Sequence, residues 1–376
     1  MPWKEVSLMD QRRELVMLAS QPGANRRELA RRWGIAPKTL YKWLSRYAES
    51  GEGGLTDQCR RPAANPLRTA PELERQVLAL RDEHPYWGAR KLAKLLQNAG
   101  VDALPAPSTI HEILRRHGRL GVGVAAGQQP FRRFEHAEPN TLWQMDFKGY
   151  VRNERGICHP LTVLDDHSRF NLCLAACGDE RAETVQSRLI ATFRRYGLPH
   201  RMTMDNGPPW GGDSEGLGYT ALTVWLMQLG IEVSHSRPYH PQTQGKDERF
   251  HRTLKVELLQ HRRFADNDEA QRIFDRYRET YNGKRPHEAL GMAVPMQRYR
   301  ASVIAYPEML PAAEYLSCDK VYKVDRSARI AVGRRRFKIG KAFIGQRIAL
   351  RPTAQDGCYR VWFSRFEIGE LDLRAS

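Results

Sequence analysis

The sequence predicts a multidomain protein with tandem all-α units at the amino-terminal end, a central α/β domain with a mixed sheet, and a small β-barrel or sandwich at the carboxyl-terminal end. The chain has 376 residues, enough for two to four domains at roughly 100–200 residues each. Apolar residues recur at helical spacing up to about residue 118, and strand-like patterns begin at Thr141 and again at Lys320. Segments rich in turn-forming residues interrupt these patterns. We therefore expect domains 1–50, 71–118, 139–300 and 315–376, with linkers 51–70 and 119–138.

Charge is distributed unevenly along the chain. Lys and Arg number 60 against 43 Asp and Glu, which gives a net charge of +17. Residues 1–140 carry +8, residues 141–300 carry +3 and residues 301–376 carry +6. This excess favours a polyanionic partner, nucleic acid first, and a central domain with its own acidic site between two phosphate-binding segments. The apolar content of 41% and charged content of 27% exclude a wholly disordered or collagen-like chain.

Neither end of the chain predicts export or a membrane partner. Met1 to Glu5 lack the apolar run of a signal peptide, and no later stretch approaches the ~18 apolar residues of a membrane span. The six cysteines are scattered with no C-x-x-C pair, which favours reduced thiols used in packing. We expect a cytoplasmic bacterial protein associated with the nucleoid.

The amino-terminal unit has the pattern of a helix-turn-helix. Asn25 can cap a helix that ends at Gly34, and a basic helix with Pro37 in its first turn follows. In a helix-turn-helix the later helix enters the major groove of DNA. The predicted DNA contacts are Lys38, Thr39, Lys42 and Arg46. The alternative is an ordinary three-helix bundle with a solvated basic face.

A second helical unit follows, with helices expected over 72–84, 88–98 and 108–117, the last capped by Ser108. Two such modules in tandem would read a bipartite DNA site. In the linker between them, Arg60 and Arg61 could follow a groove as a basic arm.

The central domain predicts a mixed sheet covered by helices on both faces. Three strands joined by short polar turns come first, and helices and strands then alternate. The expected strands are 142–147, 157–164, 170–177, 200–205 and 231–234, and the expected helices are 181–196, 221–229, 245–261 and 269–281.

Short alternating runs separated by Gly from Lys320 onward predict the small β-barrel or sandwich. Arg335 lies in a run of three arginines there and is a candidate contact to the DNA backbone. A solvated turn would look the same.

Three carboxylates occupy positions where a sheet edge and a helix could bring them together. Asp146 lies in the first central strand, Asp205 ends a later strand, and Glu248 lies in the first turn of a helix. Projected at 100° per residue, Phe250, Leu254 and Leu258 fall about 200°, 240° and 280° from Glu248, while Arg252, Lys255 and His251 fall within about 60° of it. An acid flanked by cations suits metal coordination beside a phosphate backbone, although a surface salt-bridge face would look similar.

The segments Leu-Trp-Gln-Met-Asp146, Asp205-Asn-Gly and His240-Pro-Gln-Thr-Gln-Gly-Lys-Asp-Glu248-Arg-Phe-His-Arg-Thr-Leu closely resemble the three catalytic blocks of bacterial insertion-sequence transposases. These are Asp-Asp-Glu enzymes related to retroviral integrases, and the tandem helix-turn-helix units fit the insertion-sequence-481-like branch. The resemblance implies a ribonuclease-H-like central fold in which Asp146, Asp205 and Glu248 are catalytic and hold two Mg²⁺ ions, with Mn²⁺ as a substitute. The chain departs from the group in its 42 residues between the second and third acids, with residues 208–220 as the insertion. It also lacks the zinc-binding pattern of retroviral integrases.

The resemblance implies a DNA transposase that binds the terminal inverted repeats of its element, cleaves DNA strands and transfers them to target DNA. Paired divalent ions suit this chemistry because they activate water and stabilise a departing alkoxide. The partners would be double-stranded DNA and further copies of the chain, as a homo-oligomer on DNA, because two ends must be cut and joined together. The alternative is a catalytically silent, transposase-derived DNA-binding regulator.

Other charged residues near the predicted site need separate interpretations. Asp165 and Asp166 are expected to cap a turn or pair with Arg169, Asp247 to face away from the site, and Asp213 and Glu215 to belong to the insertion. A group of basic residues is expected to contact DNA, each with a solvated surface role as the alternative. They are Arg237, His240, Lys246, Arg249, Arg252 and Lys255.

Overall fold

The computed structural model describes residues 7–58, 69–120, 135–211, 217–235 and 245–374. The chain forms two compact units, Met1–Arg68 and Thr69–Ser376. In the described ranges, no helix combines the length and apolar character needed to cross a membrane. Several residues singled out in the sequence lie outside the described residues, namely Arg60, Arg61, Asp213, Glu215, Arg237 and His240.

The first unit contains the predicted helix-turn-helix. Asn25 caps the middle helix by accepting a hydrogen bond from the Glu28 amide (3.1 Å), and Gly34 supplies the left-handed turn with a φ of 66°. Leu15, Ala30 and Leu40 are buried together where the helices meet. The helices are α1 (Leu8–Ala19), α2 (Arg26–Arg32) and α3 (Pro37–Ser50), followed by the short 3-10 helix η1 (Gly51–Leu55).

Three further helices begin the second unit, as the sequence predicts. They are α4 (Pro71–Glu83), α5 (Ala89–Asn98) and α6 (Pro107–Arg116), packed around Trp87, Leu92 and Ile110. The predicted cap at Ser108 is wrong, because α6 begins one residue earlier, after Ala106 and with Pro107 in its first turn. Proline's fixed φ suits the first helical position, so the helix starts there without a side-chain cap.

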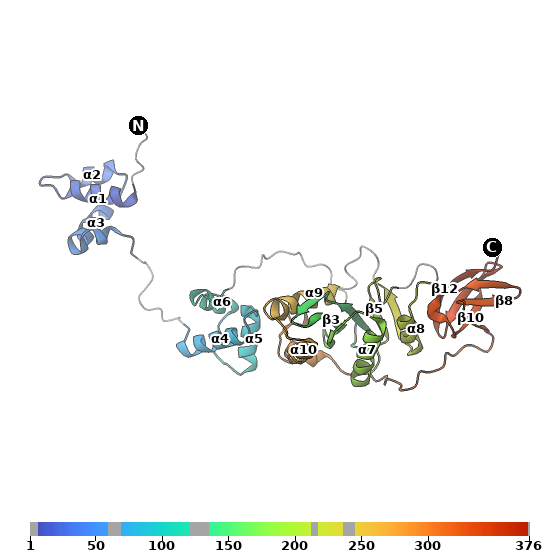
Figure 1. Cartoon of the computed structure of the whole chain (residues 1–376). Helices are drawn as coiled ribbons and strands as arrows, with labels where there is room; N and C mark the ends of the chain where they lie inside the picture. Colours follow the sequence, from blue (N-terminus) through green and yellow to red (C-terminus); the bar gives the residue numbers. More distant parts are fainter. Residues whose placement is uncertain (1–6, 59–68, 121–134, 212–216, 236–244, 375–376) are drawn as a thin grey trace. The chain divides into compact units, whose positions relative to one another are not determined.

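The central domain is built on a mixed sheet (Figure 1). Strand β3 pairs antiparallel with β1, β2 and β4, and β5 pairs parallel with both β1 and β6. The three-strand start and the later alternation of helices and strands match the prediction. The strands are β1 (Leu142–Phe147), β2 (Val151–Asn153), β3 (Gly156–Asp165), β4 (Asn171–Cys177), β5 (Arg201–Met204) and β6 (Glu232–His235).

Helices cover both faces of this sheet. Trp143, Met145 and Leu161 belong to an apolar cluster that includes residues of α7 (Ala182–Tyr196) and α8 (Ala221–Gln228). On the other face, Leu164 and Leu174 pack with residues of α9 (Gly245–Leu254) and α10 (Asn267–Gly283). The predicted helix 245–261 changes after Leu254 into a π-helical turn, η3 (Lys255–Leu259). Short helices η4 (Glu288–Leu290) and α11 (Pro295–Arg298) follow α10.

The carboxyl-terminal region forms antiparallel sheets of four strands, in the order β12-β11-β10-β7, and of two strands, β8-β9. Both sheets contribute to one apolar cluster, which also includes Val224 and Met227 of α8. The predicted small β-barrel or sandwich is therefore present as two sheets around a shared core. Its elements are β7 (Lys320–Lys323), β8 (Arg329–Val332), β9 (Arg335–Lys338), η5 (Lys341–Phe343), β10 (Arg347–Pro352), β11 (Cys358–Phe363) and β12 (Phe366–Asp372).

Candidate active site

Strand register brings Asp146 and Asp205 side by side. In the parallel pair β1 and β5, Leu142 lies opposite Arg201 and Gln144 opposite Thr203. The same register, continued beyond the end of β5, places Asp205 next to Asp146. Residues opposite one another in neighbouring strands point to the same face, and here that face is the one covered by α9. Two strand ends thus present two carboxylates at one place.

Helix α9 adds a third acid and an imidazole to the same face. Asp247 and His251 lie one turn apart and are both buried. Thr162 of β3, which lies opposite Asp146, joins them, since its Oγ1 is 3.1 Å from both carboxylate oxygens of Asp247 and 2.8 Å from Nε2 of His251. Nδ1 of His251 lies 3.9 Å from Oδ2 of Asp146. Thr162 is therefore the hydroxyl that connects the helix to the strand carrying Asp146.

The ionisable groups of this cluster are shifted toward their neutral forms. Burial, and then the negative charge of Asp205, raise the pKa of Asp146 to about 6. Burial also raises the pKa of Asp247 well above its usual range, and the charge of Asp146 adds to this. Burial and the positive charge of Lys148 lower the pKa of His251 to about 3, so its imidazole is neutral at pH 7. A cation placed among these groups would relieve the repulsion between the carboxylates.

A divalent ion fits the residues present. In the described part of the chain, one ligand atom from each of Asp146, Asp247 and His251 lies within 4.8 Å of the other two. Carboxylate oxygens are the ligands that Mg²⁺ and Mn²⁺ prefer. Asp205, whose Oδ1 accepts a hydrogen bond from the Gly207 amide (3.0 Å), stands beside this group through the strand register.

The structure places Asp247 differently from the sequence prediction, whereas Glu248 lies on the exposed side of the helix with Arg252 and Lys255, as predicted. Asp247 was expected to face elsewhere, but its side chain is 1% exposed and lies beside Asp146, whereas Glu248 is exposed on the rim of the helix. The helical projection predicts a buried Asp247, because this residue falls at about 260° from Glu248, inside the stripe of Phe250, Leu254 and Leu258. The prediction for Asp247 is therefore wrong.

His251 and Thr162 were not recognised as site residues from the sequence. His251 follows Asp247 by four residues, and this spacing was the available signal for it. Nothing in the local sequence pointed to Thr162, which meets the helix only through the packing of α9 on the sheet.

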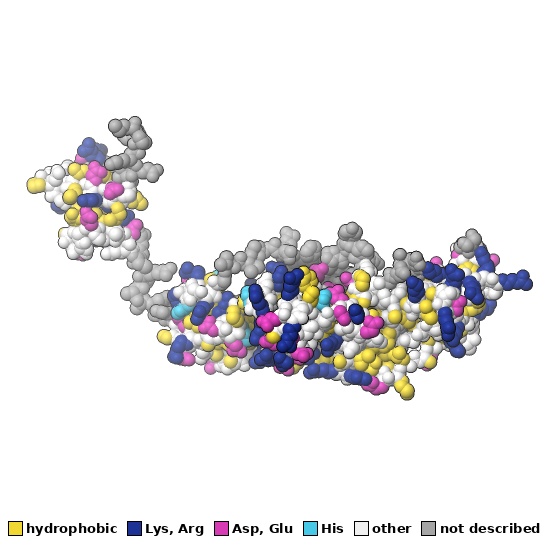
Figure 2. Space-filling model, in the orientation of Figure 1, with side chains coloured by type: hydrophobic (Ala, Val, Ile, Leu, Met, Phe, Trp, Pro, Cys, Tyr) yellow, Lys and Arg dark blue, Asp and Glu magenta, His cyan; other side chains and the backbone are white. Residues whose placement is uncertain are grey.

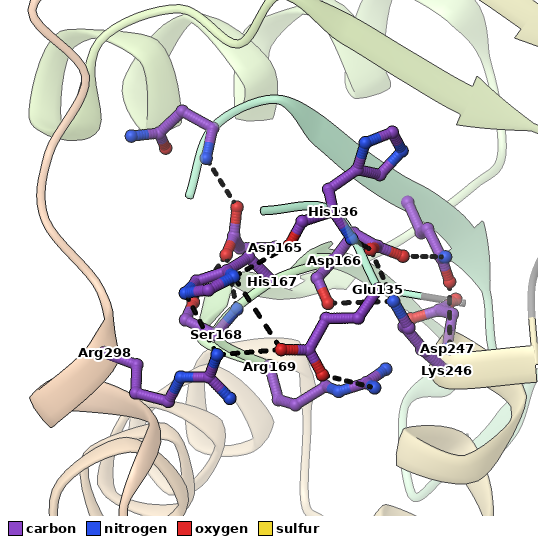
Figure 3. A network of polar contacts seen from close by, with 12 residues as sticks. Glu135, His136, Asp165, Asp166, His167, Ser168, Arg169, Lys246, Asp247 and Arg298 are labelled. Atoms are coloured by element: carbon purple, nitrogen blue, oxygen red, sulfur yellow. Dashed lines mark hydrogen bonds and ion pairs between the residues drawn. The ribbon is translucent and has the colours of Figure 1, made fainter. Parts of the chain in front are cut away.

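Lys246 lies in a buried polar network and not on the surface expected of a DNA contact (Figure 3). Its ammonium pairs with the carboxylate of Asp166, and the two side chains are 13% and 2% exposed. Asp166 also accepts hydrogen bonds from Gln144 Nε2 and from the His136 amide, both at 3.0 Å. The predicted capping role holds for Asp165, which accepts from the Ser168 amide at 2.8 Å, whereas Asp166 pairs with Lys246 in place of Arg169.

The other predicted DNA contacts that the structure describes are on accessible surfaces. Arg249, Arg252 and Lys255 are exposed on the outer side of α9 and at the start of η3. In α3, Lys38 is exposed, Thr39 is partly exposed, and Lys42 and Arg46 lie over the Trp43 ring, 4.8 and 5.3 Å from its centroid. Arg335 is exposed and donates a hydrogen bond to the Leu373 carbonyl (2.6 Å). Figure 2 shows Lys and Arg side chains gathered over the carboxyl-terminal sheets.

Family models match the chain along most of its length. An integrase core domain matches residues 136–241, a second integrase core model matches residues 229–295, and the C-terminal domain of IS481 family transposases matches residues 319–376. A helix-turn-helix domain matches residues 11–63 and a homeodomain-like domain matches residues 39–114. These matches support an IS481-like, transposase- and integrase-like protein, with helix-turn-helix units ahead of the integrase core.

Relatives of this IS481-like protein occur in bacterial insertion elements. The 39.2 kDa protein of insertion element IS476 from Xanthomonas euvesicatoria is 28% identical over 257 residues, 65% of this chain and 69% of that protein. The 31.7 kDa protein of insertion element IS407 from Burkholderia multivorans is 24% identical over 251 residues, 62% of this chain and 86% of that protein. Retroviral polyproteins also match, and the chain covers 6–11% of their length. Among solved structures, a simian T-cell lymphotropic virus intasome contains a chain that is 17% identical, with a TM-score of 0.38 and coverage of 77% of this chain and 97% of that one.

Proposed function

We propose that this protein is a transposase that binds the terminal inverted repeats of its own element, cleaves DNA at the element's ends and joins those ends to target DNA. The observation that carries the proposal is the closeness of Asp146 and Asp205 on the face covered by α9. It is supported by the register of β1 and β5 extended by two residues, and by the charge of Asp205, which raises the pKa of Asp146. In an integrase core, a pair of acids at the ends of neighbouring strands suits phosphoryl transfer more than it suits a structural role.

Asp146, Asp205 and Glu248 are proposed to hold two divalent cations, Mg²⁺ or Mn²⁺. When bound, such ions supply an activated water and stabilise the developing charge on the leaving oxygen. Asp146 and Asp205 would bind the cations at the ends of β1 and β5, and Glu248 would bind them from the exposed side of α9. Asp247, His251 and Thr162 would not bind the cations. As uncharged groups they would pack against Asp146 and hold it in position.

The exposed cations are proposed to position the DNA. Arg249, Arg252 and Lys255 stand on the outer side of the helix that carries Glu248, where they would bind phosphates next to the reacting bond. The α3 residues Lys38, Thr39, Lys42 and Arg46 would contact the terminal repeats. Because two ends must be held together, we propose that the protein acts as a homo-oligomer on DNA in the nucleoid.

A cleavage and joining assay tests this function. Purified protein would be incubated with labelled terminal-repeat DNA and Mg²⁺, and nicking and strand joining would be measured for wild type, Asp146→Ala and a matched control, Glu183→Gln. Glu183 is an exposed acid of α7, on the opposite side of the sheet. We expect products from wild type and the control and none from Asp146→Ala. Repeat binding with no nicking or joining by wild type would favour the silent DNA-binding regulator.

A further inference from the structure

Among the described residues, the side chains of the first turn of α9 make polar contacts and do not enter an apolar cluster. The buried apolar side chains of this helix are Phe250 and Leu254, in its second and third turns. The residues before them are Gly, Lys, Asp, Glu and Arg, and none of these can be anchored in an apolar core. Glu248 lies within this turn. The position of its carboxylate therefore depends on what Lys246 and Asp247 contact.

Besides the hydrogen bond from Thr162 to the Asp247 carboxylate, contacts made by Lys246 and by the Asp247 amide fix this turn to the body of the sheet. Lys246 pairs with the Asp166 carboxylate and also donates to the Asp166 carbonyl oxygen (3.0 Å). Gln144 of β1 completes a closed set, since its Nε2 donates to Asp166 (3.0 Å) and its Oε1 accepts from the Asp247 amide (3.3 Å). Figure 3 shows Lys246 and Asp247 of α9 beside Asp166, which follows the end of β3, and Gln144 extends the set to the strand that carries Asp146.

The ion pair is too enclosed to serve as a phosphate contact. The side chains of Lys246 and Asp166 are 13% and 2% exposed, so each charge is compensated by the other in a place that water hardly reaches. Moving Lys246 out to a phosphate would leave the Asp166 charge buried with its main cation removed, which is unfavourable. Lys255, at the start of η3, is exposed, so it could reach a phosphate without leaving a buried partner.

We propose that Lys246 is a positioning residue, whose buried ion pair with Asp166 fixes the first turn of α9 and so holds Glu248 over the ends of β1 and β5. This inference rests on the proposed function, in which Glu248 binds a cation. It assigns Asp166 and Gln144 to the same task, as the partners of Lys246 and of the Asp247 amide.

Cleavage kinetics distinguish positioning from DNA binding. We would compare wild type, Lys246→Met, Lys246→Arg and Lys255→Met by DNA affinity and by single-turnover cleavage at saturating DNA and Mg²⁺. Positioning predicts that Lys246→Met lowers the saturated rate by about 10–100-fold, as removal of supporting residues around a metal site does, with DNA affinity unchanged. Lys246→Arg should recover most of the rate because a guanidinium can still pair with Asp166. Lys255→Met, at a proposed phosphate contact, should weaken DNA affinity. Weakened DNA affinity of Lys246→Met at an unchanged saturated rate would overturn the inference.

A double variant keeps the test valid if Lys246→Met alone is poorly folded. Lys246→Met with Asp166→Asn removes both charges and leaves no buried charge unpaired, but it still lacks the anchor. We expect its saturated rate to stay low. Recovery to the wild-type rate would show that the pair is needed only to avoid an orphan charge, and would overturn the inference.

Hydrogen exchange separates this inference from the proposed function. In the full-length protein without DNA, the Asp247 amide, which donates to Gln144, and the amides of residues 249–252, which bond to carbonyl groups of the first turn, should exchange faster in Lys246→Met than in wild type, and no faster in Lys255→Met. Failure of wild type to cleave repeat DNA would refute the proposed function while leaving this measurement informative. Exchange equal to wild type in Lys246→Met would refute the anchoring role.

Discussion

The two faces of the central sheet differ although alternate residues of the same strands build them. In β1, Met145 is fully buried in the apolar cluster with α7 and α8, while its neighbour Asp146 faces α9. In β3, Leu161 and Thr162 are divided in the same way. The face covered by α7 and α8 gains its stability from apolar burial. The face covered by α9, the polar face, combines the apolar cluster of Leu164 and Leu174 with ionisable groups that are held together at a cost in stability. The comparison indicates that function is concentrated on the costly face.

The largest effect should come from replacing, one at a time, the two neighbouring acids of α9 by their amides. Glu248→Gln is expected to lower cleavage at least about 10³-fold, because the bound ions supply several kcal/mol of transition-state stabilisation. Asp247→Asn should keep most of the activity, since burial favours the neutral acid and an amide can make similar hydrogen bonds. Single-turnover cleavage of repeat DNA measures both. The reverse order would move the catalytic role to Asp247 and change the account of the polar face.

The next effect separates the two faces by stability. Leu161→Ala should lower the free energy of unfolding by about 2–5 kcal/mol, because it opens a cavity in the apolar cluster. Thr162→Val should cost about 1–3 kcal/mol, because Asp247 and His251 lose their shared hydroxyl. Denaturant unfolding measures both, and cleavage per folded molecule should fall only for Thr162→Val. Equal losses of activity would remove the functional difference between the faces.

A smaller effect is expected in how the stability of the folded protein depends on pH, through the ionisation of Asp146. In the folded protein the pKa of Asp146 is about 6, above the unfolded value of about 3.9. Ionisation therefore penalises the folded state, and stability present below pH about 4 is lost as the pH rises through about 6. Asp146→Asn escapes this loss, so without metal it should unfold about 2–4 °C higher than wild type at pH 7.5, for a gain of about 1 kcal/mol.

At pH 4 the difference between Asp146→Asn and wild type should vanish. Adding Mg²⁺ at pH 7.5 should raise the unfolding temperature of wild type and leave that of the variant unchanged. Thermal unfolding by circular dichroism suffices for both comparisons. If Asp146→Asn were less stable than wild type at pH 7.5 without metal, the proposed repulsion between Asp146 and the neighbouring carboxylates would be contradicted.

The smallest effect lies on the outer side of α9. Arg252→Ala should make the dependence of log affinity on log salt shallower by about 1, because one phosphate contact is lost, with the saturated cleavage rate unchanged. Arg276→Ala, which removes an exposed cation of α10, is the matched control and should change neither. Equal slopes for the two variants would show that Arg252 makes no phosphate contact.

Much of the fold follows from local sequence patterns. The alternation in Leu142–Phe147, the continuous apolar run in Asn171–Cys177 and the apolar stripes of α5, α6 and α10 each act over a few residues, so they predict elements directly. The start of α6 at Pro107 and the π-helical turn after Leu254 were missed, because helix ends depend on local backbone details that apolar spacing does not specify.

The inward-facing polar residues could be predicted only in part. Asp146 and Asp205 follow from their positions at strand ends. Asp247 and Lys246 were misassigned because a helical pattern counts apolar side chains, and a buried charge is recognisable only once its partner is known. Those partners are distant in sequence, with Asp247 85 residues from Thr162 and Lys246 80 residues from Asp166.

The most direct test is to locate bound Mn²⁺ by anomalous diffraction from crystals of the protein with terminal-repeat DNA. The account predicts manganese bound by Asp146 and Asp205, with Glu248 completing the site. Manganese bound by Asp146, Asp247 and His251, with Asp205 and Glu248 both remote from it, would contradict the proposed catalytic triad.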